Sequence, residues 1–69
     1  EGTIPDDAVQ RALDGLEPLL REAFILKHVD DMSYDQMEQV TGAGRSALKM
    51  RVKRACDALR AMLEVGEHA

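Results

Sequence analysis

This 69-residue chain has few residues that could form a covalent cross-link or bind a metal ion. Its one cysteine, Cys56, cannot form an internal disulfide, and neither Cys56 nor the separated histidines His28 and His68 provide a zinc spacing. Stability must therefore come from packing, which is typical of a reducing compartment, and we expect no metal or cofactor. So short a chain buries only about 60% of its unfolded surface, and we expect residues 1–69 to form a single small domain.

Membrane segments and catalytic motifs are missing too. No apolar run approaches the roughly 20 residues that cross a bilayer, and the opening EGTIPDD is acidic where a signal peptide would be basic and then apolar. No Ser, His and acid support a catalytic triad, and there is no glycine-rich phosphate loop. We expect a cytoplasmic protein without membrane insertion, not an enzyme. Because the chain begins at Glu1 and not at methionine, we also expect a fragment of a longer protein.

Charge is distributed unevenly along the chain. Residues 1–38 hold ten acidic and three basic residues, whereas residues 39–69 hold six basic and three acidic ones. Five of those six bases fall within residues 45–54, which contain no acid. A local basic block on a protein of net charge -4 indicates a site for a polyanion, and a solvated helical face is the alternative.

The apolar pattern predicts only helices. A short amphipathic helix ends at Gly15 and Pro18, and a second helix starting at Pro18 is apolar on more than one side, so we expect it to be the most buried element. Ser33 and Gln36 have the spacing of a capping box for a third helix that reaches about Thr41. After the break at residues 42–44, the fourth helix is predicted over residues 45–63. One core is expected to hold Leu13, Leu16, Leu20, Phe24, Leu48, Val52 and Leu59.

The faces of the fourth helix follow from 100° per residue. Its predicted buried stripe is Leu48, Val52, Ala55, Leu59 and Met62. The outward side is expected to carry Ser46, Met50, Lys53 and Asp57, flanked by Arg45, Lys49 and Arg54. Arg51 lies beside the stripe, where its guanidinium could reach an acid of the second or third helix. Cys56 is expected to pack at the border of the stripe, and His28 to cap its helix or lie exposed.

A short helix, a glycine-containing break and a second helix with outward bases together predict a helix-turn-helix over residues 33–63, whose second helix enters the DNA major groove. Residues 31–60, DMSYDQMEQVTGAGRSALKMRVKRACDALR, resemble without a gap the promoter-reading region four of bacterial extracytoplasmic-function (ECF) sigma factors. Similar or identical residues stand at Ser33, Tyr34, Asp35, Met37, Val40, Gly42, Leu48, Lys49, Arg51, Val52, Arg54, Ala55 and Leu59. Upstream, the similar positions are Leu13, Leu16, Arg21, Glu22, Phe24 and Leu26. Glu38 departs from the pattern, which has a small residue there.

This resemblance implies an all-α four-helix domain with a helix-turn-helix and no wing, acting as a non-catalytic specificity subunit of RNA polymerase. The fourth helix would read the promoter −35 element, and another surface would bind the polymerase β-flap. The DNA contacts implied on that helix are Arg45, Ser46, Lys49, Met50, Lys53 and Arg54. Lys27, Ser33 and Tyr34 would lie near phosphates, although Tyr34 could instead be a core aromatic.

Two further expectations concern partners. Surplus apolar residues such as Ile25 and Met37 favour a protein-binding surface on the first three helices, open to the β-flap and to an anti-sigma factor; the alternative is that the fold buries them. A different function class is a sigma-like interaction module that binds an anti-sigma factor without reading DNA. The outward bases at residues 45, 49, 53 and 54 favour DNA binding, and the isolated domain is expected to be a monomer.

Overall fold

The computed structural model describes residues 6–67, which form four α-helices and one π-helical turn. In chain order these are α1 (Asp6–Asp14), α2 (Pro18–Phe24), η1 (Ile25–Val29), α3 (Tyr34–Thr41) and α4 (Arg45–Glu67). No strand occurs within these residues, so the predicted all-α helix-turn-helix fold is confirmed. None of the described helices is long and apolar enough to cross a membrane.

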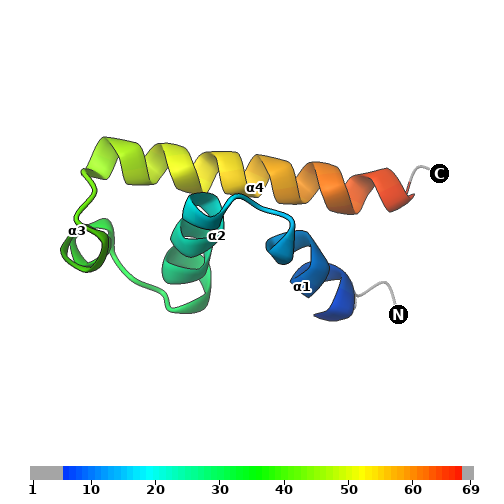
Figure 1. Ribbon diagram of the computed structural model, residues 1–69, viewed down its shortest axis with the longest axis horizontal. Coiled ribbons are helices and arrows are strands. Elements are labelled where there is room, and N and C mark those ends of the chain that lie inside the picture. The colour runs from blue at the N-terminus through cyan, green and yellow to red at the C-terminus, as the bar shows by residue number, and fades with distance from the viewer. Residues whose placement is uncertain (1–5, 68–69) are drawn as a thin grey trace.

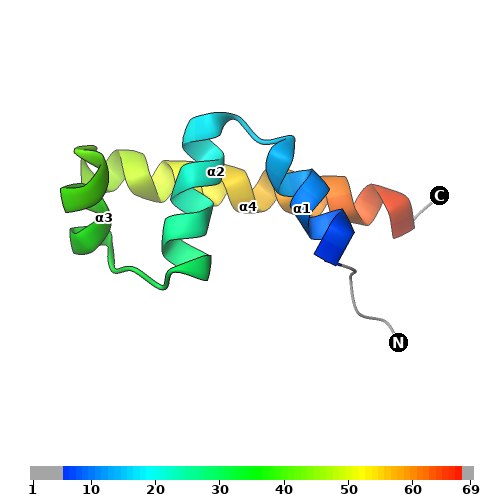
Figure 2. The same ribbon diagram turned by 60° about the horizontal axis from the view of Figure 1, so that its bottom comes forward.

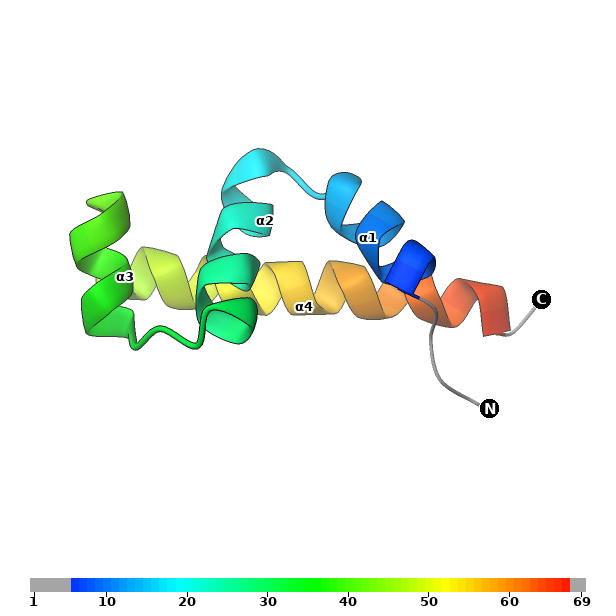
Figure 3. The ribbon, with the colours of Figure 1, turned by 90° about the horizontal axis from the view of Figure 1, so that it is seen from below.

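Helix α4 is the axis of the molecule, and the three other helices lie along one side of it (Figure 1). Its 23 residues extend about 35 Å at 1.5 Å per residue. Helix α3 lies beside the first turns of α4, α2 crosses its middle, and α1 lies near its C-terminal half (Figures 2 and 3). The side of α4 that faces away from α1, α2 and α3 is therefore left open.

Local signals set most helix boundaries. Pro18 occupies the first turn of α2. At the start of α3, the Ser33 hydroxyl accepts from the Gln36 backbone N–H at 3.1 Å, and the Gln36 side chain accepts from the Ser33 N–H at 2.9 Å, so the predicted capping box is confirmed. Gly42 ends α3 in the left-handed region with φ +79°, which a glycine adopts without strain. Helix α4 continues one turn beyond the predicted end at residue 63.

The π-turn η1 interrupts what the sequence predicts as one regular helix from Pro18. Here the Asp30 N–H donates to the Ile25 carbonyl, five residues back, at 2.9 Å, and the Met32 N–H donates to the Leu26 carbonyl at 3.0 Å. Asp31 follows with φ +58°, a conformation that aspartate tolerates better than most residues. The wide turn carries Lys27 and redirects the chain toward α3.

Two apolar clusters stand where one core was expected. The lower cluster joins α1 to the C-terminal half of α4 through Ala12, Leu13, Leu16, Ala55 and Leu59. The upper cluster joins α2 and α3 to the N-terminal half of α4 through Ala23, Met37, Leu48 and Val52. Leu20 and Phe24 are only partly buried against the lower cluster. The core divides because α1 and α3 contact opposite halves of one long helix.

Two expectations about burial are wrong, and of the two alternatives stated for Ile25 and Met37, burial by the fold is the one that holds at Met37. The helix from Pro18 is not the most buried element, because one face packs on α4 while Leu19 and Val29 remain exposed. Met62 is 41% exposed and lies outside the buried stripe of α4. Met37 is fully buried in the upper cluster and so cannot contribute to a protein-binding surface; Ile25 is half-buried.

Candidate nucleic-acid interface

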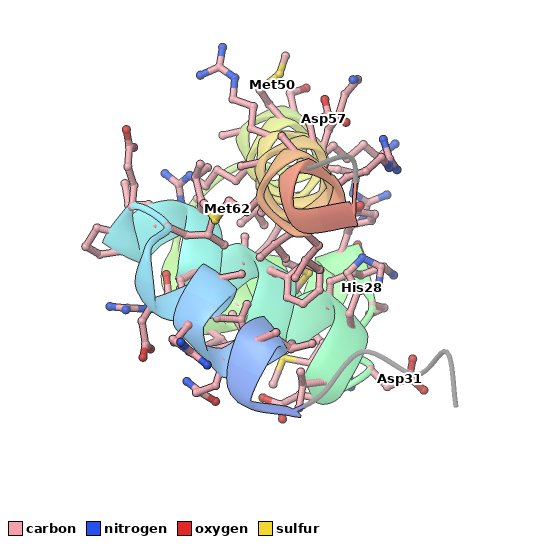
Figure 4. All side chains as sticks on the ribbon, turned by 90° about the vertical axis from the view of Figure 1, so that its right-hand side faces the viewer. His28, Asp31, Met50, Asp57 and Met62 are labelled. Carbon is pink, nitrogen blue, oxygen red and sulfur yellow. The ribbon has the colours of Figure 1, made fainter. Side chains whose placement is uncertain are left out.

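The open side of α4 carries the outward residues that the sequence predicts. Leu48, Val52, Ala55 and Leu59 are buried against the other helices. The residues predicted to lie on or beside the outward side of the same helix are all exposed: Arg45, Ser46, Lys49, Met50, Lys53, Arg54 and Asp57. Figure 4, a view along α4, shows Met50 and Asp57 pointing away from α1, α2 and α3. We call the surface formed by Ser46, Lys49, Met50, Lys53 and Arg54 the basic face of α4.

One acid moderates the charge of this face. The Lys53 ammonium donates to the Asp57 carboxylate at 3.0 Å, and the Arg60 guanidinium lies 3.4 Å from the other Asp57 oxygen. The hydrogen bond and charge of Lys53 hold the pKa of Asp57 below its ordinary value, and the charge of Arg60 adds to this. Among the side chains that the structure describes, Lys49 and Arg54 have no acidic partner. Of the three cations on the basic face of α4, these two are therefore the most available to an anion.

A second group of predicted residues meets at the junction of η1, α3 and α4. The Lys27 ammonium lies 4.6 Å from the centre of the Tyr34 ring, and the Lys49 ammonium lies 5.7 Å from the same centre. Lys27 also donates to the Met32 carbonyl at 3.3 Å. Lys27 and Tyr34 thus extend the basic face of α4 onto the neighbouring elements.

Tyr34 and Ser33 each have a structural task as well. Tyr34 is half-buried and packs against the upper cluster, so the core and surface roles considered for it are combined in one ring. The Ser33 hydroxyl accepts the capping bond of α3, and its own proton is still free to be donated. Both residues lie at the first turn of α3, where unpaired backbone N–H groups favour an anion.

Arg45, the first residue of α4, is held by acids of α3. Its guanidinium forms an ion pair with Asp35, and its Nε lies 3.6 Å from the Glu38 carboxylate. Sequence reasoning identified neither acid as a functional residue. The available signal was their spacing of three, which puts both carboxylates on one face of α3. Which base they meet depends on the path of the chain through residues 42–44, which no local pattern gives.

Arg51, Cys56 and His28 lie beside the basic face but not on it. Arg51 is half-buried, as its position beside the stripe predicts, but the acid partner expected for it is not found among the described side chains. Cys56 packs against the upper cluster, as expected, with its Sγ 3.7 Å from Nε2 of His28. His28 is exposed, as one expectation had it, and its ring lies 4.9 Å from that of Phe24.

The hollow described between helices lies away from these cations. It has a volume of about 380 Å³, is open to solvent and is lined by Ala8, Arg11, Ala12, Met62 and Leu63. These residues belong to α1 and the C-terminal half of α4, at the opposite end of the molecule from α3 (Figure 1). The cations around Lys49 therefore lie apart from this hollow, on the exposed side of α4, and exposed cations along one helix suit an extended polyanion.

Comparison with known proteins gives one match. Residues 6–59, from the start of α1 to Leu59 in α4, match the family model described as Sigma-70, region 4. This stretch covers well over half of the 69 residues and includes both the capping box and the basic face of α4. Neither the curated proteins nor the solved structures contain a match to the chain.

Proposed function

Since the chain belongs to the sigma-70 region 4 family, whose domains recognise the promoter −35 element and are not catalytic, we propose that it is the −35 reading domain of an ECF-type sigma factor. The ECF assignment rests on the resemblance of residues 31–60. In this proposal residues 1–69 act as one monomeric domain in the cytoplasm, α4 enters the major groove, and another surface docks on the β-flap of RNA polymerase.

The observation that carries the proposal is the basic face of α4. Five predicted DNA contacts are exposed on this helix, with Ser46, Met50 and Lys53 opposite its buried stripe and Lys49 and Arg54 flanking them. Lys49, which has no acidic partner in the described part of the chain, is the side chain we expect at guanine O6 and N7, where a good contact discriminates bases by about 1–3 kcal/mol. Met50 is 49% exposed and suits a thymine methyl group. The Ser46 hydroxyl can donate a hydrogen bond either to a base edge in the groove or to the DNA backbone.

Phosphate contacts complete the interface without adding sequence information. Lys53 and Arg54 on α4 are expected to neutralise phosphates, and so is Lys27. The ammonium groups of Lys27 and Lys49 both lie near the Tyr34 ring. Ser33 and Tyr34 offer hydroxyl groups near the first turn of α3. Arg45 belongs to the same side of α4, with its charge already paired to two carboxylates.

Binding of duplex DNA tests this proposal. One small module with few phosphate contacts and a net charge of -4 should bind a duplex enriched from a random pool with micromolar or weaker affinity, and the affinity should fall steeply with salt. We expect Lys49→Glu to abolish binding measured by fluorescence anisotropy. The matched control is Arg11→Glu, which reverses an exposed charge on α1 and should leave binding nearly unchanged. Equal affinities of the two variants would refute the assignment.

A separate protein-binding surface is the second part of the proposal. Leu19 on α2 and Val40 on α3 are 53% and 59% exposed, and Val29 is exposed between them in the chain. Apolar side chains away from the basic face support docking of the β-flap, and an anti-sigma factor would compete there or across the DNA face.

Amide shifts on adding a flap fragment should appear on α2 and α3. Shifts confined to α4, or none at high-micromolar flap, would overturn it. Anti-sigma binding without any DNA binding would instead favour the interaction-module alternative.

A further inference from the structure

We propose that Arg45 is a positioning residue, committed to α3, that masks the charges of Asp35 and Glu38 beside the DNA and does not itself contact a base. The inference rests on the proposed DNA-binding role of α4. Some cations near the DNA would then read the sequence, whereas Arg45 would reduce the repulsion between the two carboxylates and the polyanion.

The geometry ties Arg45 to α3 from the first position of α4. Asp35 lies in the first turn of α3 and Glu38 one turn later, so their carboxylates stand on the same face of that helix. The Arg45 guanidinium reaches both, pairing with Asp35 and lying 3.6 Å from Glu38 through Nε. Only residues 42–44 separate the two helices. One side chain therefore bridges the two helices of the helix-turn-helix next to their connection.

Electrostatics indicate what this bridge does. A cation at the first position of α4 adds to the partial positive charge of the helix N-terminus, an unfavourable placement that the two carboxylates offset. Together the three side chains carry a net charge of -1, so this corner offers no positive charge to a phosphate. If Arg45 turned toward a base, both carboxylates would be left unpaired at the edge of the interface. By contrast, Lys49 and Arg54 have no described acidic partner to give up.

The two possible roles of Arg45 predict different results for base preference. An arginine bound to guanine specifies one base pair, so Arg45→Ala would relax the preference at that position only. A masking arginine specifies none, so Arg45→Ala would weaken binding to all duplexes by the same factor. Because the unpaired carboxylates act through charge, that factor should shrink as the salt concentration rises.

The experiment measures affinity and base preference for the whole chain and three variants. On a panel of duplexes with single base-pair changes, we expect Arg45→Ala to lose affinity by roughly fivefold at low salt, the size of an exposed charge effect, with an unchanged preference profile. The triple variant R45A/D35N/E38Q removes the unpaired charges and should recover at least the affinity of the wild type. Arg45→Lys, which can pair with only one carboxylate at a time, should be intermediate.

Each other outcome overturns the inference. Loss of preference at a single base pair in Arg45→Ala would make Arg45 a base contact. Failure of the triple variant to recover affinity, with its helicity unchanged by circular dichroism, would leave Arg45 a merely structural role. If Arg45→Ala does not fold, the comparison of R45K with the triple variant R45K/D35N/E38Q answers the same question. Absence of any DNA binding by the wild type is distinguishable from all of these, because it would refute the proposed function itself.

Discussion

Replacing Leu48 by alanine tests how α4 is held against the rest of the domain. Leu48 and Met37 are both fully buried, and with Ala23 and Val52 they form the upper cluster beneath the basic face of α4. The change removes three buried carbon atoms, worth about 2.4 kcal/mol at about 0.8 kcal/mol each, before the cost of the cavity. With the cavity included, we expect a loss of about 2–5 kcal/mol.

A loss of this size is a large fraction of the total free energy of unfolding of the domain. A 69-residue domain has a total stability of roughly 3–10 kcal/mol at 0.05–0.15 kcal/mol per residue. Urea unfolding followed by circular dichroism measures it, and Met50→Ala on the exposed side of the same helix is the matched control, expected to change stability by less than about 0.5 kcal/mol. Equal unfolding midpoints for the two variants would refute the assignment of the upper cluster.

Three other predictions address the turn, the acid on α4 and the lower cluster. Gly42→Ala should lower the free energy of unfolding in urea by about 1–2 kcal/mol, because its φ of +79° strains an alanine although a Cβ there would meet no atom. Gly44→Ala, where a Cβ has equal space and φ is not positive, should lower it little. Lys53 holds the pKa of Asp57 below its ordinary value, so the ionised Asp57 stabilises the folded state at neutral pH, and this contribution is lost as the pH falls through the lowered pKa. Lys53→Met should therefore raise the pKa of Asp57 measured by NMR titration. Phe24→Ala should cost about 2 kcal/mol, less than Leu48→Ala in the same assay, since Phe24 is only partly buried.

Local chemistry explains why much of the fold could be predicted from the sequence. The capping box at Ser33 and Gln36 depends only on residues three apart, and the end of α3 depends on one glycine. The faces of α4 follow from its helical period, so the division between the buried Leu48 and the exposed Lys49 was predictable. Met62 was not, because its burial depends on how far α1 extends beside α4.

The features that the sequence did not reveal depend on how separate helices meet. The apolar pattern from Pro18 predicted a regular helix and not the π-turn at Ile25–Val29, which brings Lys27 to the Tyr34 ring. The division into two clusters follows from the length of α4 relative to its short neighbours. The pairing of Arg45 with acids of α3 depends on the path through residues 42–44, so helical angles alone placed Arg45 at the edge of the outward side without its partners.

The central claim is that the basic face of α4 reads DNA. The most direct test is to map the backbone amide shifts of the protein when a selected promoter duplex is added. We expect the perturbed amides to cluster at Ser46, Lys49, Met50, Lys53 and Arg54, with a second group from Lys27 to Tyr34, while those of α1 stay unchanged. Perturbations centred on α1, or an unchanged spectrum at high-micromolar duplex and low salt, would contradict it.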